Sequence, residues 1–125
     1  VWQKSMDLVC SVYSLTEQFP REEIYGLTSQ MRRSAVSIPS NIAEGRNRGS
    51  KNDYVQFLRV AFSSGAELET QIEICKRIPD LKTLQYKKAD ELLNEVMRMF
   101  NVLIAKLSTK RNGLSSTRYT LRPTP

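Results

Sequence analysis

Apolar residues recur every three or four positions in four segments of the sequence, and this spacing is typical of amphipathic helices. The segments cover about residues 2–18, 21–44, 51–77 and 81–108. A helix of about 25 residues is roughly 37 Å long, so the longer segments predict long helices. The pattern therefore predicts an all-α fold in which long helices pack their apolar faces together over residues 1–109.

The first predicted helix carries two neighbouring apolar rows. One row holds Trp2, Met6, Val9 and Tyr13, and the row beside it holds Leu8, Val12 and Leu15. Together the rows form the wide apolar face of a bundle helix, so both are expected to point inward. Phe19-Pro20 should end this helix, because proline disfavours helical geometry in the residue before it. The connection to the second helix is then short, and the two must be antiparallel neighbours.

The second predicted helix contains a proline at position 39. Proline lacks an N–H and crowds the carbonyl group four residues earlier, so the helix should be kinked near Pro39. The alternative is a break with a new start at Ser37, since proline is tolerated in a first turn. Ser37 and Ser40 lie close enough in sequence to bond the freed backbone group.

Polar and small residues follow this proline. Asn41 is expected either to bond the backbone that the kink exposes or to reach a neighbouring helix. For Asn41 and Glu44 a structural role is favoured over ligand binding. Gly45 should close the helix in the left-handed conformation, and residues 46–49 should form an exposed loop.

The third predicted helix begins with a capping signal. Ser50 and Asp53 have the spacing of a capping box, so the helix should start at Lys51. Gly65 lies in its interior, where glycine costs about 1 kcal/mol relative to alanine. A glycine there is explained if another backbone passes closely, from the second helix or from another subunit. Ile78-Pro79-Asp80 should end this helix and begin the fourth.

The two cysteines, Cys10 and Cys75, fall on apolar helical rows and lack the spacing of a metal site. Buried free thiols in a reducing compartment are the expected state of both. No apolar run reaches the length of a membrane span, and the first residues do not form a secretory signal. A cytoplasmic location without membrane association is therefore expected.

Catalytic chemistry finds little support in this sequence. Its 125 residues include no histidine, which removes the commonest general base and the usual nitrogen ligand of zinc. Glu69 and Glu73 are one helical turn apart, but Lys76 and Arg77 follow at a spacing that predicts ion pairs. We therefore expect a protein that is not an enzyme and that needs no metal, cofactor or small-molecule substrate.

Positive charge is concentrated at the end of the chain. The formal net charge is +6, from 19 Lys and Arg against 13 Asp and Glu. Residues 110–125 carry Lys110, Arg111, Arg118 and Arg122 and no acid, so they supply +4 and residues 1–109 supply +2. This composition predicts a basic C-terminal tail, and the whole balance favours a polyanionic partner.

Eight basic residues are candidates for a nucleic-acid-binding surface: Arg32, Arg33, Arg46, Arg48, Lys51, Arg111, Arg118 and Arg122. Such a surface would bind phosphates with strong salt dependence and weak sequence specificity. No aromatic-rich sheet or loop is evident for base stacking, so direct base readout is not expected. The alternative is that these arginines are solvated or held in ion pairs.

A longer motif adds a family resemblance. The run SQMRRSAVSIPSNIAEGRNRGS is preceded by FPREEIYGL and followed by FLRVAFSSGAELETQIEI. With these segments the chain resembles the small bacterial proteins encoded by intervening sequences in 23S rRNA genes, the S23 family, over about residues 2–107. The resemblance implies an antiparallel up-and-down four-helix bundle that assembles into a ring, with a homopentamer favoured. Ile78-Pro79-Asp80 departs from the family pattern, which has a glycine-containing turn there.

The resemblance also bears on function. Members of the S23 family are encoded within rRNA genes, and related proteins are accessory factors of diversity-generating retroelements. The resemblance therefore implies RNA or a ribonucleoprotein as the partner. The leading hypothesis is therefore a non-enzymatic oligomeric bundle that binds RNA or a ribonucleoprotein through basic surfaces. The alternative is a homo-oligomeric protein-interaction scaffold that does not bind nucleic acid.

Overall fold

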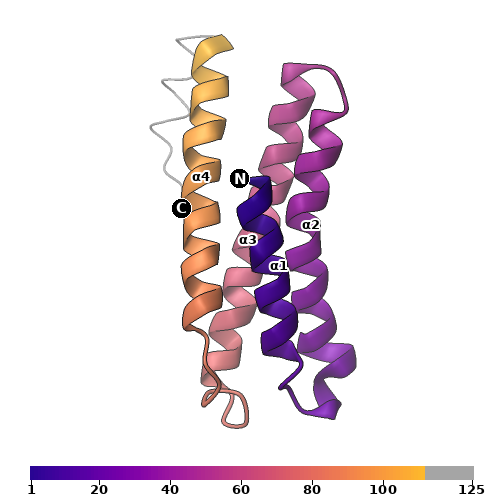
Figure 1. Cartoon of the computed structure of the whole chain (residues 1–125), viewed down its shortest axis with the longest axis vertical. Helices are drawn as coiled ribbons and strands as arrows, with labels where there is room; N and C mark the ends of the chain where they lie inside the picture. Colours follow the sequence, from indigo (N-terminus) through magenta and orange to yellow (C-terminus); the bar gives the residue numbers. More distant parts are fainter. Residues whose placement is uncertain (112–125) are drawn as a thin grey trace.

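The computed structural model describes residues 1–111. This part of the chain folds into the helices α1 (Trp2–Thr16), α2 (Ser29–Arg46), α3 (Lys51–Arg77) and α4 (Lys87–Arg111). Two short helical segments precede α2, the 3-10 turn η1 (Arg21–Glu23) and the π-helical turn η2 (Ile24–Thr28). Among the described residues there is no strand. Because α1 and α3 each contact both α2 and α4, the helices form the predicted up-and-down bundle (Figure 1).

The core runs along the bundle axis and draws on all four α-helices. Its largest fully buried side chains are Phe100, Leu8, Met31, Ile38, Ile42, Leu58, Leu68, Ile72, Leu81, Val12, Val96 and Cys75. Burial of apolar surface at about 25 cal/mol per Å² is the main force that holds such a bundle together. Within α2 and α3 the buried side chains recur every three or four residues, as the apolar spacing of the sequence predicts.

Only one of the two predicted apolar rows of α1 enters this core. Leu8, Val12 and Leu15 are buried, whereas Trp2, Met6 and Tyr13 are 37–41% exposed. Val9 of the same row is partly buried and packs against the core, so this row lies at the edge of the buried face. The prediction that both rows point inward is wrong. Cys10 is likewise exposed, against expectation, while Cys75 is buried as predicted.

The fourth helix begins at Lys87, six residues after the predicted start, and ends at Arg111. The segment before it is a turn in which the Tyr86 hydroxyl donates to the Leu81 carbonyl at 2.8 Å. Leu81 and Tyr86 are both buried, so the turn is anchored in the core rather than wound into the helix. Burial raises the pKa of the Tyr86 hydroxyl and of the neighbouring Cys75 thiol.

The second predicted helix is interrupted near Gly26 and not at the proline. Gly26 has φ −109° and ψ −114°, outside helical geometry, and lies inside η2, just before α2. Pro39 instead lies inside α2, which runs without a break from Ser29 to Arg46, so a new start at Ser37 is wrong. Glycine accepts such a conformation because it has no Cβ.

Side-chain hydrogen bonds reinforce α2 around the proline. The Asn41 amide nitrogen donates to the Ser37 carbonyl at 2.8 Å and to the Ser37 hydroxyl at 2.9 Å. The Ser37 and Ser64 hydroxyl oxygens are 2.7 Å apart, which joins α2 to α3. Asn41 therefore bonds the backbone at Ser37 and not the Ala35 carbonyl that Pro39 cannot bond, so the expected bond to the freed group is not formed.

Two glycines mark places of close packing. Gly45 is buried within α2, and a Cβ there would lie 2.7 Å from the Phe57 Cβ of α3. The predicted left-handed closing role of Gly45 is wrong, since the positive φ of 86° belongs to Gly49 in the following turn. At Gly65 a Cβ would collide with the Met97 sulfur of α4. Close packing at Gly65 is thus confirmed, but its neighbour is a side chain of α4.

We expect Gly45→Ala to destabilise the bundle by about 1–3 kcal/mol, although alanine is normally the better helix former. The added methyl group would force α2 away from α3 at Phe57. Urea unfolding of Gly45→Ala, with the exposed neighbour Ala43→Ser as control, measures this difference. A Gly45→Ala protein as stable as the parent would contradict the close approach.

Candidate nucleic-acid interface

Arg32 is held in the packing between α1 and α2 and is not part of an open cationic surface. Its Nε donates to the Thr16 hydroxyl at 2.8 Å, and its guanidinium lies 4.3 Å from the centre of the Tyr13 ring. Thr16 and Tyr13 belong to the last turn of α1, so Arg32 fastens α2 to α1. A cation–π contact combined with a charge-assisted hydrogen bond holds the side chain in one orientation.

Arg48 is also held by its neighbours. It pairs with the Glu44 carboxylate at 3.2 Å, and its guanidinium lies 5.0 Å from the centre of the Phe57 ring. The pair is about half exposed, so it contributes little to stability. Its effect is on charge, because Glu44 neutralises Arg48 and leaves it a weak attractor of phosphate.

Arg46 and Lys51 are brought together at the turn between α2 and α3, at the upper end of the bundle in Figure 1. They line a hollow of about 380 Å³, here called the end pocket, whose walls are Gly45, Arg46, Gly49, Ser50, Lys51, Tyr54 and Leu107. No carboxylate lines this pocket. Among the described side chains, neither Arg46 nor Lys51 forms an ion pair.

The local sequence explains why the end pocket forms. Gly49 takes the left-handed conformation that lets the chain reverse, and the Ser50 hydroxyl accepts a hydrogen bond from the Asp53 N–H at 3.1 Å. The predicted cap is thereby confirmed, and α3 starts at Lys51 as expected. The positive end of the α3 dipole adds to the two cations on one side of the turn.

A second cationic hollow lies on the outer side of α1, η2 and α2. This side groove has a volume of about 790 Å³ and is lined by Tyr13, Ile24, Tyr25, Thr28, Ser29, Arg32, Arg33, Val36 and Ser37. Arg33 is exposed there, beside the fixed Arg32. Because Arg33 and Arg46 are thirteen positions apart in one helix, the groove and the end pocket are separated by about 20 Å.

The structure thus divides the predicted basic surface. Arg46 and Lys51 share the end pocket, Arg33 faces the side groove, and Arg32 and Arg48 are held by neighbouring side chains. Arg118 and Arg122 lie outside the described residues, and Arg111 is described only as the last backbone residue of α4. Tyr25 of the side groove and Tyr54 of the end pocket were not among the predicted site residues, since neither belongs to an aromatic cluster.

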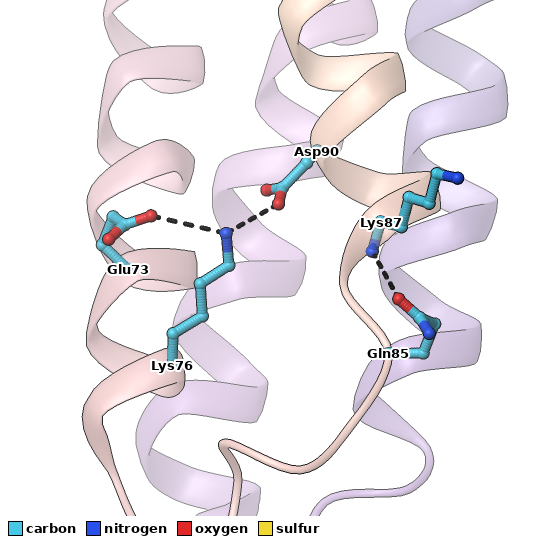
Figure 2. A network of polar contacts seen from close by, with 5 residues as sticks. All are labelled: Glu73, Lys76, Gln85, Lys87 and Asp90. Carbon is cyan, nitrogen blue, oxygen red and sulfur yellow. Dashed lines mark hydrogen bonds and ion pairs between the residues drawn. The ribbon is translucent and has the colours of Figure 1, made fainter.

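Of the ion pairs predicted on α3, the one between Glu73 and Lys76 is present, whereas Glu69 and Arg77 form none among the described residues. Figure 2 shows the Lys76 ammonium between two carboxylates, 2.7 Å from Asp90 of α4 and 3.5 Å from Glu73. The hydrogen bond to Asp90 raises the pKa of Lys76 and fixes the first turn of α4 against α3. Across residues 1–111 no group of His, Cys, Asp or Glu side chains is arranged to hold a metal ion.

These features define a small all-α bundle protein with two cationic hollows, one at an end of the bundle and one along its side. The chain belongs to the family of 23S rRNA-intervening sequence proteins, whose family model matches residues 1–102. This match confirms the resemblance drawn from the SIPSNIAEG motif. None of the curated proteins compared with the chain matches it. In the described part of the chain, no helix is both long and apolar enough to cross a lipid bilayer.

We expect Arg32→Ala to lower the free energy of unfolding by about 1 kcal/mol, because it removes the hydrogen bond to Thr16 and the contact with Tyr13. Arg33→Ala, the matched loss of one guanidinium, should change stability by less than about 0.5 kcal/mol. Chemical unfolding of both variants tests the assignment. Equal stabilities would mean that Arg32 does not fasten α2 to α1.

Proposed function

We propose that the protein is a non-enzymatic, homo-oligomeric module of the cytoplasm that binds RNA or a ribonucleoprotein through phosphate contacts. The end pocket is the part of the described surface that best suits this role. The observation that carries the proposal is the pairing of Arg46 and Lys51 in a hollow without carboxylates. An ammonium and a guanidinium side by side, with no internal partner, attract an anion of high charge density.

The lining of the pocket favours the backbone of a nucleic acid over a base edge. It includes two cations, two glycines and one tyrosine, and no carboxylate. Contacts of this kind position a nucleic acid without reading its sequence. The net charge of +6 adds a long-range attraction that steers a polyanion toward the bundle.

A protein-interaction scaffold is the second candidate function, and one observation favours it. Six large apolar side chains of α1, η2 and α2 are exposed by 37% or more: Trp2, Met6, Tyr13, Ile24, Tyr25 and Val36. Exposed apolar surface gathered on one side is typical of protein interfaces. A homo-oligomer, with a pentamer favoured by the family resemblance, would use such surface for assembly.

The double variant Arg46→Gln/Lys51→Gln should weaken binding to a structured RNA. The slope of log K against log salt should become shallower by about 1–2, since each lost cation removes one phosphate contact. Fluorescence anisotropy at several salt concentrations measures both quantities. The control is Lys82→Gln/Lys88→Gln, which removes the same charge from exposed positions at the opposite end of the bundle. Equal losses in the two variants would exclude the end pocket as the binding site.

Light scattering of the purified protein should give the molar mass of a homo-oligomer, with a pentamer favoured. Ring assembly would repeat each end pocket around one axis, so that phosphate contacts add along one RNA. A monomeric mass at micromolar concentration would contradict the oligomeric part of the proposal. A monomeric mass would not bear on the RNA contact, which the binding experiment at several salt concentrations tests.

A further inference from the structure

We propose that the side groove binds an unpaired nucleotide of RNA, with the base stacked on Tyr25 and the phosphate held by Arg33. The inference rests on the proposed RNA-binding function and adds the class of RNA, one that carries single-stranded nucleotides. Nothing in the sequence pattern pointed to it, because Tyr25 stands apart from the other aromatic residues. In the folded chain the Tyr25 ring is exposed to solvent in the groove that Arg33 also lines.

The exposure of Tyr25 is the first observation. The residue is 96% exposed, whereas the other large apolar side chains lining the groove, Tyr13, Ile24 and Val36, are only 40–45% exposed. Tyr25 precedes Gly26, where the backbone leaves helical geometry, and so it projects from η2 rather than packing on the bundle. An aromatic ring with both faces in water gains free energy when a flat partner stacks on it.

The charge of the groove is the second observation. Arg32 and Arg33 both line it, and none of the lining residues is acidic. Because Arg32 is held by Thr16 and Tyr13, its charge stays in place while Arg33 is free to meet a ligand. Thr28 adds a buried hydroxyl oxygen in the groove wall that has no hydrogen-bond partner among the described residues. The occupant should therefore be anionic and able to form hydrogen bonds.

A nucleotide combines the properties that the groove requires. It carries a flat aromatic ring, a phosphate and several hydrogen-bonding groups, and the volume of about 790 Å³ lies in the range of pockets for small organic ligands. Bases are available for stacking only where RNA is unpaired, since a duplex stacks them internally. A second copy of this chain is the competing occupant, and the measurement of oligomer mass below distinguishes it from a nucleotide.

The test compares a single-stranded oligouridine with a blunt-ended RNA duplex of the same length. Tyr25→Ala should weaken binding of the single strand about tenfold, the size expected for loss of one stacked base, and leave duplex binding unchanged. Tyr25→Phe keeps the ring and should bind like the parent. Val102→Ala, which removes an exposed apolar side chain on α4, is the surface control and should also bind like the parent.

Each outcome decides between distinct conclusions. Unchanged single-strand binding by Tyr25→Ala, with RNA still bound, overturns the nucleotide site while the proposed function stands. A loss of oligomer mass in Tyr25→Ala, measured by light scattering, also overturns it, since the groove would then be an interface between copies. If the parent protein binds neither RNA at low salt, the proposed function fails and this inference fails with it. Circular dichroism of each variant verifies that the bundle remains folded.

Discussion

The close contact between α2 and α3 is the constraint on which the rest of the structure depends. The two helices can approach closely at Gly45 because glycine has no side chain to collide with Phe57. Further along, the hydrogen bond between the Ser37 and Ser64 hydroxyls joins α2 to α3. This pairing is the most extensive helix contact in the described chain. It leads into the turn at Gly49, and this turn brings Arg46 and Lys51 to the wall of one hollow.

One residue type takes different roles according to its neighbours. Arginine at the α1–α2 boundary finds a tyrosine ring and a threonine hydroxyl, so Arg32 becomes part of the packing. Arginine one turn beyond Glu44 finds a carboxylate and a phenyl ring, so Arg48 is neutralised. Arg46 and Lys51 have no such neighbours. A count of basic residues is therefore a poor guide to an electrostatic surface, because local partners decide which charges remain available.

The sequence predicted what depends on periodicity and on local backbone chemistry. The bounds of α3, the Ser50 cap and the buried rows of α2 and α3 follow from spacing within single helices. It did not predict features that depend on where another helix lies. From its sequence position alone, Gly45 could either end a helix or pack inside one. Its role follows from the position of Phe57 on α3, which the sequence pattern does not reveal. The exposure of Tyr25 and the break at Gly26 depend in the same way on how the chain turns from α1 into α2.

We propose that α2 and α3 together present an anion-binding turn at one end of the bundle. Backbone amide chemical shifts, recorded while a structured RNA is titrated into the protein, test it without any mutation. The account predicts that the largest changes at low salt fall on residues 45–54 and fade as salt is added. Changes centred on the opposite end, around residues 78–90, with residues 45–54 unaffected, would contradict it.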